Sequence, residues 1–77
     1  MNNDLKFSIK SARNNVDLTQ DEIAKMLGVT TKTYSDYEKG KTQMKIGTAL
    51  RFSEITKVPI DNIIFLSKNY TSSVQNG

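Results

Sequence analysis

Side chains that donate and accept hydrogen bonds crowd one short segment, which reads VTTKTYSDYEKGK from Val29 to Lys41. The spacing is that of a helix, yet most of its polar positions hold Thr, Ser and Asp, which are weak helix formers. Such a face contributes little to helix stability and is suited to hydrogen bonding outward. We therefore interpret it as a binding surface.

A cluster of positive charge begins inside this segment and continues past it. The net charge of +3, from 11 basic and 8 acidic residues, says little alone, but no acid interrupts the stretch from Lys39 to Arg51. A local cluster of this kind is typical of an anion-binding surface, although a solvated basic face without a partner is the alternative. Its members are Lys39, Lys41, Lys45 and Arg51.

The composition excludes several kinds of chemistry. The chain has no Cys and no His, so it offers no disulfide, thiolate metal site, thiol nucleophile or imidazole base. Nothing pairs a nucleophile with a base, and the acids are accounted for by helix starts and surface faces. We expect no enzyme activity, no cofactor, no metal and no small-molecule ligand.

The distribution of apolar residues argues against a membrane protein. The longest apolar run is Ile63–Leu66, far shorter than the roughly 20 residues of a membrane span. The first ten residues, MNNDLKFSIK, lack the apolar core of a signal peptide. Together with the absence of Cys, these features predict a cytoplasmic protein.

The binding segment and the helix before it carry clear end signals. Thr19 and Glu22 form a capping box, and Gly28 fits the left-handed position that ends a helix. Thr30 is a plausible N-cap for a helix over Thr31–Lys39, which Gly40 ends. The short connection leaves room only for a tight turn, so the two helices cross at a large angle as a helix-turn-helix.

The flanking segments read as three further helices, in one domain over residues 1–66. Helical spacing predicts a first helix from Leu5, Ile9, Ala12 and Val16, and a fourth over Ile46 to about Thr56. The fourth helix presents Ile46, Ala49, Leu50, Phe52 and Ile55 as apolar positions and begins at the poor cap Lys45.

The end of this domain follows Pro59, where a fifth helix is predicted over Ile60–Leu66, with Ile60, Ile63 and Ile64 packed inward. No strand is expected, because no polar/apolar alternation is long enough. Residues 67–77 are polar and are expected to form a frayed tail.

The residues LTQDEIAKMLGVTTKTYSDYEKGK, from Leu18 to Lys41, resemble the phage-repressor-like (XRE or Cro-like) helix-turn-helix family. With the flanking helices, the resemblance extends over about residues 5–66. It implies an all-α fold, a compact five-helix bundle of the lambda-repressor-like type. It also implies that the helix over Thr31–Lys39 enters the major groove of double-stranded DNA.

The resemblance also assigns roles to single residues. Gln20 matches a position that contacts phosphate while bracing the recognition helix, with a solvated residue as the alternative. Asp36 could accept from cytosine, exclude wrong bases or merely pair with Lys32. The base-reading positions are Thr31, Lys32, Ser35 and Asp36; the backbone-binding positions are Thr19, Gln20, Thr30, Thr33, Lys39, Lys41, Thr42, Gln43 and Lys45.

Two residue pairs are expected to support this surface. In the family an Arg of the first helix pairs with a Glu near the end of the recognition helix, and Arg13 and Glu38 occupy those positions. Unpaired surface charges are the alternative. Tyr34 and Tyr37 are expected in the core with their hydroxyls at its edge, rather than as stacking platforms for single strands.

The family pattern is broken at two places. Met44-Lys45 replaces the usual Pro followed by Ser or Thr, so the fourth helix lacks the family's usual start signal and gains a cation. Thr56 replaces a common Leu, so looser packing is expected there.

The resemblance implies a transcriptional regulator, a repressor, that binds a two-fold DNA site as a homodimer. Phe65, Leu66 and Tyr70 are candidates for the dimer face, with core packing or disorder as alternatives. The alternative function is a protein-binding module, such as an antitoxin or a regulatory subunit.

Overall fold

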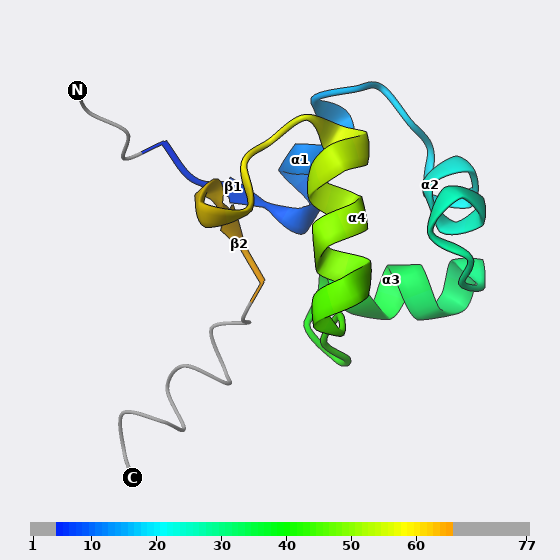
Figure 1. Ribbon diagram of the computed structural model, residues 1–77. Helices are drawn as coiled ribbons and strands as arrows, with labels where there is room; N and C mark the ends of the chain where they lie inside the picture. Colours follow the sequence, from blue (N-terminus) through cyan, green and yellow to red (C-terminus); the bar gives the residue numbers. More distant parts are fainter. Residues whose placement is uncertain (1–4, 66–77) are drawn as a thin grey trace, which may run out of the picture.

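The computed structural model describes residues 5–65, which form four α-helices, one 3-10 turn and two very short strands. The order is β1 (Phe7–Ser8), α1 (Ile9–Asn14), α2 (Gln20–Leu27), α3 (Thr31–Lys39), α4 (Ile46–Thr56), η1 (Ile60–Asn62) and β2 (Ile63–Ile64). Figure 1 shows α4 in the middle of the molecule, α2 and α3 on one side of it, and β1 and β2 on the other. The mostly helical fold with a helix-turn-helix agrees with the expectation.

The two helices of the helix-turn-helix begin and end where their sequence signals lie. The Thr19 hydroxyl accepts from the backbone N–H of Glu22, whose carboxylate accepts from the backbone N–H of Thr19 at 2.9 Å. Gly28 and Gly40 follow α2 and α3 with φ of 76° and 77°, in the left-handed region that favours glycine. Thr30 caps α3 by accepting from the backbone N–H of Thr33.

The first helix is shorter than predicted. Ser8 caps α1 by accepting from the backbone N–H of Ser11, so the helix begins at Ile9. Leu5 lies before it and is 66% exposed, and Val16 lies in the turn after it. Only Ile9 and Ala12 of the predicted apolar stripe are buried.

The prediction of a fifth α-helix over Ile60–Leu66 was wrong for the residues that the structure describes. A single 3-10 turn over Ile60–Asn62 leads into β2, which pairs in parallel with β1, Phe7 opposite Ile63 and Ser8 opposite Ile64. The β-branched Ile63 and Ile64 suit extended backbone, and pairing with β1 gives their backbone groups the hydrogen-bond partners that a helix would otherwise provide. The expectation of no strand was therefore also wrong. Leu66 lies outside the described residues.

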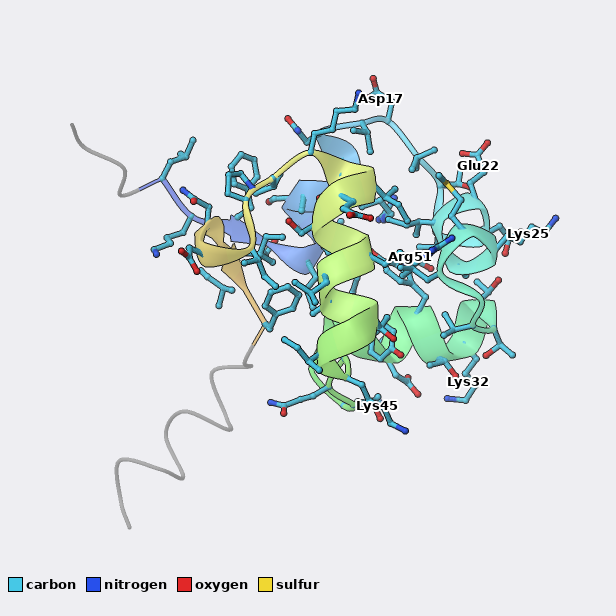
Figure 2. All side chains as sticks on the ribbon, viewed as in Figure 1. Asp17, Glu22, Lys25, Lys32, Lys45 and Arg51 are labelled. Atoms are coloured by element: carbon cyan, nitrogen blue, oxygen red, sulfur yellow. The ribbon has the colours of Figure 1, made fainter. Side chains whose placement is uncertain are left out.

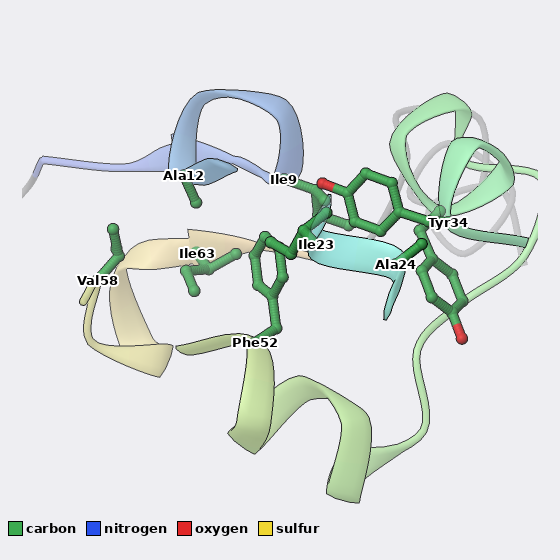
Figure 3. Close-up of a cluster of buried hydrophobic side chains, with 9 residues drawn as sticks. Ile9, Ala12, Ile23, Ala24, Tyr34, Phe52, Val58 and Ile63 are labelled. Carbon is green, nitrogen blue, oxygen red and sulfur yellow. The ribbon is translucent and has the colours of Figure 1, made fainter. Parts of the chain in front are cut away.

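The core joins both ends of the described residues, 5–65, to the helix-turn-helix. Figure 3 shows Ile9, Ile23 and Tyr34 converging on Phe52, with Val58 and Ile63 beyond it. The ring centroids of Tyr34 and Phe52 lie 6.3 Å apart, and those of Phe52 and Phe65 also lie 6.3 Å apart. Because burial of one large apolar side chain contributes about 1.5–3 kcal/mol, this cluster fixes α3 against α1 and α4.

One face of α4 differs from the expectation. Its buried positions are Ala49, Phe52 and Thr56, whereas Ile46 and Leu50 are 72% and 51% exposed. Thr56 is fully buried, and its hydroxyl donates to the Phe52 carbonyl at 2.9 Å, so this residue packs without a lost hydrogen bond.

Candidate nucleic-acid interface

The orientation of α3 is set by a largely buried ion pair. Arg13 Nε lies 2.6 Å from Glu38 Oε2, and the Arg13 and Glu38 side chains are 12% and 8% exposed. Arg13 also donates to the Leu18 carbonyl at 2.9 Å, and Gln20 Nε2 donates to Glu38 Oε1 at 2.9 Å. Glu38 on α3 is thus bound from both α1 and α2.

The Glu38 carboxylate stays ionised in this position. Burial alone would raise the pKa of Glu38, but the neighbouring polar groups, led by the Arg13 guanidinium, hold that pKa below its usual value. The same hydrogen bond raises the pKa of Arg13, against the opposing effect of burial. The pair is charged at neutral pH and ties the last turns of α3 to α1 and α2.

Tyr34 and Tyr37 form the inner face of α3, as expected. They are 0% and 8% exposed, and their rings lie 6.1 Å apart in an edge-to-face arrangement. The expectation that both hydroxyls reach the edge of the core was wrong for Tyr34, whose hydroxyl is buried without a hydrogen-bond partner. Burial, together with the nearby Glu38 carboxylate, raises the pKa of Tyr34, so its hydroxyl is neutral.

The outer face of α3 carries the residues that the sequence assigned to base reading. Thr31 and Lys32 are exposed, while Ser35 and Asp36 are half-buried. Lys32 Nζ lies 3.1 Å from Asp36 Oδ2, so these two residues form an ion pair one turn apart in the free protein. The Thr31 hydroxyl donates to the Asp21 carboxylate of α2.

The residues assigned to the DNA backbone lie at the starts of α2 and α3, at the end of α3 and in the loop before α4. Figure 2 shows Lys32 and Lys45 projecting towards the lower edge of the view, from α3 and from the loop before α4. Gln20 and Thr33 are half-buried. The exposed members are Thr19, Thr30, Lys39, Lys41, Thr42, Gln43 and Lys45.

Gln20 has a second hydrogen to offer beyond its bond to Glu38. An amide nitrogen carries two donors, and one of them is bound to Glu38 Oε1. Gln20 begins α2, where backbone N–H groups are unsatisfied and the helix dipole favours an anion. The residue therefore braces α3 and can still donate outward.

Two contacts across elements were not predicted from the sequence. Asp21 was interpreted only as a favourable charge at a helix start, yet it accepts from Thr31, ten residues later. Arg51, assigned to the basic cluster, donates from its Nε to the Met26 carbonyl at 3.1 Å and so joins α4 to α2. Neither contact has a helical or strand spacing that could signal it.

The described residues provide little for other kinds of site. Within residues 5–65, no three metal-binding side chains of the Asp and Glu type gather. In the same range, no helix has the length and apolar character needed to cross a membrane. Phe65 of the predicted dimer face is partly buried and packs against the core; Leu66 and Tyr70 lie outside the described residues.

Comparison with known proteins agrees with this arrangement. A family model described as helix-turn-helix matches residues 9–63, which run from the start of α1 to the first residue of β2. No curated protein and no solved structure matches the chain.

Proposed function

Because the chain belongs to the XRE/Cro-like helix-turn-helix family of DNA-binding regulators, we propose that it is a repressor that reads double-stranded DNA with α3. The observation that carries the proposal is the contrast between the two faces of α3. Tyr34 and Tyr37 anchor one face in the core, and Thr31 and Lys32 extend from the other into solvent.

The mechanism divides affinity from sequence choice. Lys39, Lys41 and Lys45 are exposed cations close to the end of α3, suited to phosphates, and their binding releases counterions. Thr31, Lys32, Ser35 and Asp36 supply a methyl group, donors and acceptors to base edges in the major groove. The Arg13–Glu38–Gln20 cluster keeps α3 in one orientation, so that both sets act together.

The length of α3 favours binding as a dimer. Nine residues at about 1.5 Å each give a helix of roughly 13 Å, which follows only about four base pairs at 3.4 Å each. A site this short recurs too often to specify a gene. Two copies on a two-fold site, with half-sites one DNA turn apart, would double the sequence that is read.

A titration of labelled duplex DNA, followed by fluorescence anisotropy at two salt concentrations, tests the proposal. Selection of bound duplexes from a random pool then gives the sequence, symmetry and spacing of the site. Lys32→Ala should weaken binding to the selected site, whereas Lys25→Ala, on the exposed side of α2, removes the same charge as a matched control. Absence of binding at low salt would overturn the proposal.

A further inference from the structure

The exposed side chains of the first two residues of α3 each contact an acid. Thr31 donates its hydroxyl hydrogen to the Asp21 carboxylate, which belongs to α2, and the Lys32 ammonium lies 3.1 Å from the Asp36 carboxylate. Thr31, Lys32 and Asp21 are all exposed, so neither contact is forced by packing. The single hydroxyl hydrogen of Thr31 and one of the three ammonium hydrogens of Lys32 are therefore bound to acids.

The contact with Asp21 changes what Thr31 can bind. A hydroxyl has one hydrogen and two acceptor lone pairs, and here the hydrogen is committed to Asp21. What Thr31 still offers outward is a methyl group and an acceptor. Adenine N6 and cytosine N4 donate to such an acceptor, and the thymine methyl packs against a methyl; guanine presents only the acceptors N7 and O6 in the major groove.

The charge of Asp21 acts in the same direction. A carboxylate beside the reading position repels the electron-rich edge of guanine and favours an exocyclic amino group. The positive charge of Lys32 is already paired with Asp36, so it compensates the Asp21 charge less. Hydrogen-bond direction and charge thus disfavour the same base.

We propose that Asp21 is a specificity-determining positioning residue, which acts through Thr31 to exclude guanine from the base that Thr31 faces. Asp21 holds the Thr31 side chain in one rotamer with its hydrogen turned away from DNA. This inference rests on the proposed function of α3. It goes further, because it assigns to α2 a part in sequence choice and states the class of base that is rejected.

Three variants separate the contact from the charge. Asp21→Ala removes both, Asp21→Asn keeps an acceptor oxygen without the charge, and Thr31→Val keeps the methyl without the hydroxyl. Asp61→Ala, at an exposed position in η1, removes the same charge elsewhere and is the matched control. Circular dichroism at the binding temperature establishes that each variant is folded.

Duplexes selected with native protein and with each variant are compared base by base. In Asp21→Ala we expect guanine to gain about fivefold or more at one position of each half-site, the lower end of what one base contact discriminates. Asp21→Asn should keep most of the native preference. Adding Asp21→Ala to Thr31→Val should change the selection much less than Asp21→Ala changes it in native protein, because only the effect of the charge is left to remove, and Asp61→Ala should select the native site.

A measurement without DNA gives an independent readout. Scalar couplings of Thr31 should report one χ1 rotamer in the native protein and rotamer averaging in Asp21→Ala. Averaging already present in the native protein would overturn the inference.

The selection distinguishes the failure of this inference from failure of the proposed function. If Asp21→Ala alters affinity equally for all sequences, Asp21 acts only as a charge. The inference is then overturned, while the proposed function as a DNA-binding regulator stands. If the native protein enriches no sequence, the proposed function fails, and the inference fails with it.

Discussion

Glu38 receives hydrogen bonds from two other elements, and its carboxylate is only slightly exposed. Such a pair adds little net stability compared with apolar residues, because both charges lose water on burial. Breaking it is costly, since one charge then stays buried without a partner. At the scale of single residues, the cluster is therefore a device that fixes the direction of α3 rather than a source of stability.

Arg13→Met should lower the free energy of unfolding by about 3–5 kcal/mol, because it leaves the Glu38 charge uncompensated. The double variant Arg13→Met/Glu38→Leu should recover much of this loss. Urea denaturation measures both, with Lys10→Met, at an exposed position of α1, as the control. A double variant no more stable than the single one would contradict this account.

The same cluster makes stability depend on pH. The pKa of Glu38 is lower in the folded chain than in the unfolded chain, so its stabilising effect is complete above the unfolded value of about 4.3 and is lost as the pH falls through the folded value. Urea denaturation between pH 7 and pH 3 should show this loss. Glu38→Gln should make the free energy of unfolding depend less steeply on pH in the acid range. An unchanged pH dependence would contradict the role given to Glu38.

Tyr34 carries a polar atom that the core does not satisfy. Its hydroxyl is buried near the Glu38 carboxylate but makes no hydrogen bond of normal geometry, and a buried group without a partner costs about 1–3 kcal/mol. Tyr34→Phe should therefore leave the free energy of unfolding unchanged or raise it. Guanidinium denaturation measures the difference, with Tyr37→Phe as a comparison. A loss above about 1 kcal/mol would mean that the hydroxyl has a partner.

At the scale of elements, the parts that could be predicted were those with local signals. Both ends of α2 and α3 follow from Thr19, Glu22, Gly28 and the residues that flank α3, all within a few positions of the helix that they delimit. The end of the described chain could not be predicted in this way. Ile63 pairs with Phe7, 56 residues earlier, and no local pattern encodes a contact so distant.

The candidate site divides in the same manner. The polar outer face of α3 was visible from spacing alone, and the family pattern supplied the partnership of Arg13 and Glu38. The contact of Asp21 with Thr31 depends on how α2 and α3 cross, which spacing does not give. The exposure of Ile46 and Leu50 was missed because helical periodicity gives faces but does not say which face is inward.

The start of α4 offers a test in which stability and binding change in opposite directions. Lys45 occupies the N-cap without a side-chain hydrogen bond to the helix. Lys45→Ser should add about 1 kcal/mol to the free energy of unfolding. It should also weaken DNA binding. The plot of the logarithm of the binding constant against the logarithm of salt concentration should become shallower, by about 0.9 in slope. Denaturation and anisotropy titrations measure the two effects.

Lys45→Ala serves as the matched control, because it removes the charge without adding a cap. It should lose binding to the same extent as Lys45→Ser but gain no stability. If Lys45→Ser binds DNA as tightly as the native protein, Lys45 does not contact phosphate.

At the scale of the whole molecule, the net charge is small and its placement decides what it can do. The exposed Lys39, Lys41 and Lys45 stand at the end of α3 and in the loop that follows, whereas Lys57 lies beyond the other end of α4. A modest total charge can therefore attract DNA to one side. Under the proposed function, this placement of charge would orient the protein on DNA before any base is read.

Lys41→Gln and Lys57→Gln each lower the net charge from +3 to +2. We expect Lys41→Gln to weaken binding to all duplexes alike and to reduce the salt dependence by about 0.9, because one phosphate contact is lost. Lys57→Gln should leave both quantities unchanged. Anisotropy titrations at several salt concentrations decide; equal effects would mean that only the total charge matters.

The short parallel ladder of β1 and β2 lies between residues 5 and 65, the two ends of the described chain (Figure 1). Asn62 Nδ2 donates to the Leu5 carbonyl at 2.8 Å, and Lys6 Nζ donates to the Asp61 carbonyl at 3.1 Å, so side chains reinforce it. In a parallel pair, tension applied at those two ends draws the strands lengthwise past each other. The ladder bonds are then loaded together in shear instead of opening one by one. The helices that lie between β1 and β2 in the chain, including α3, would thus be shielded from a mechanical pull until the pairing of β1 with β2 breaks.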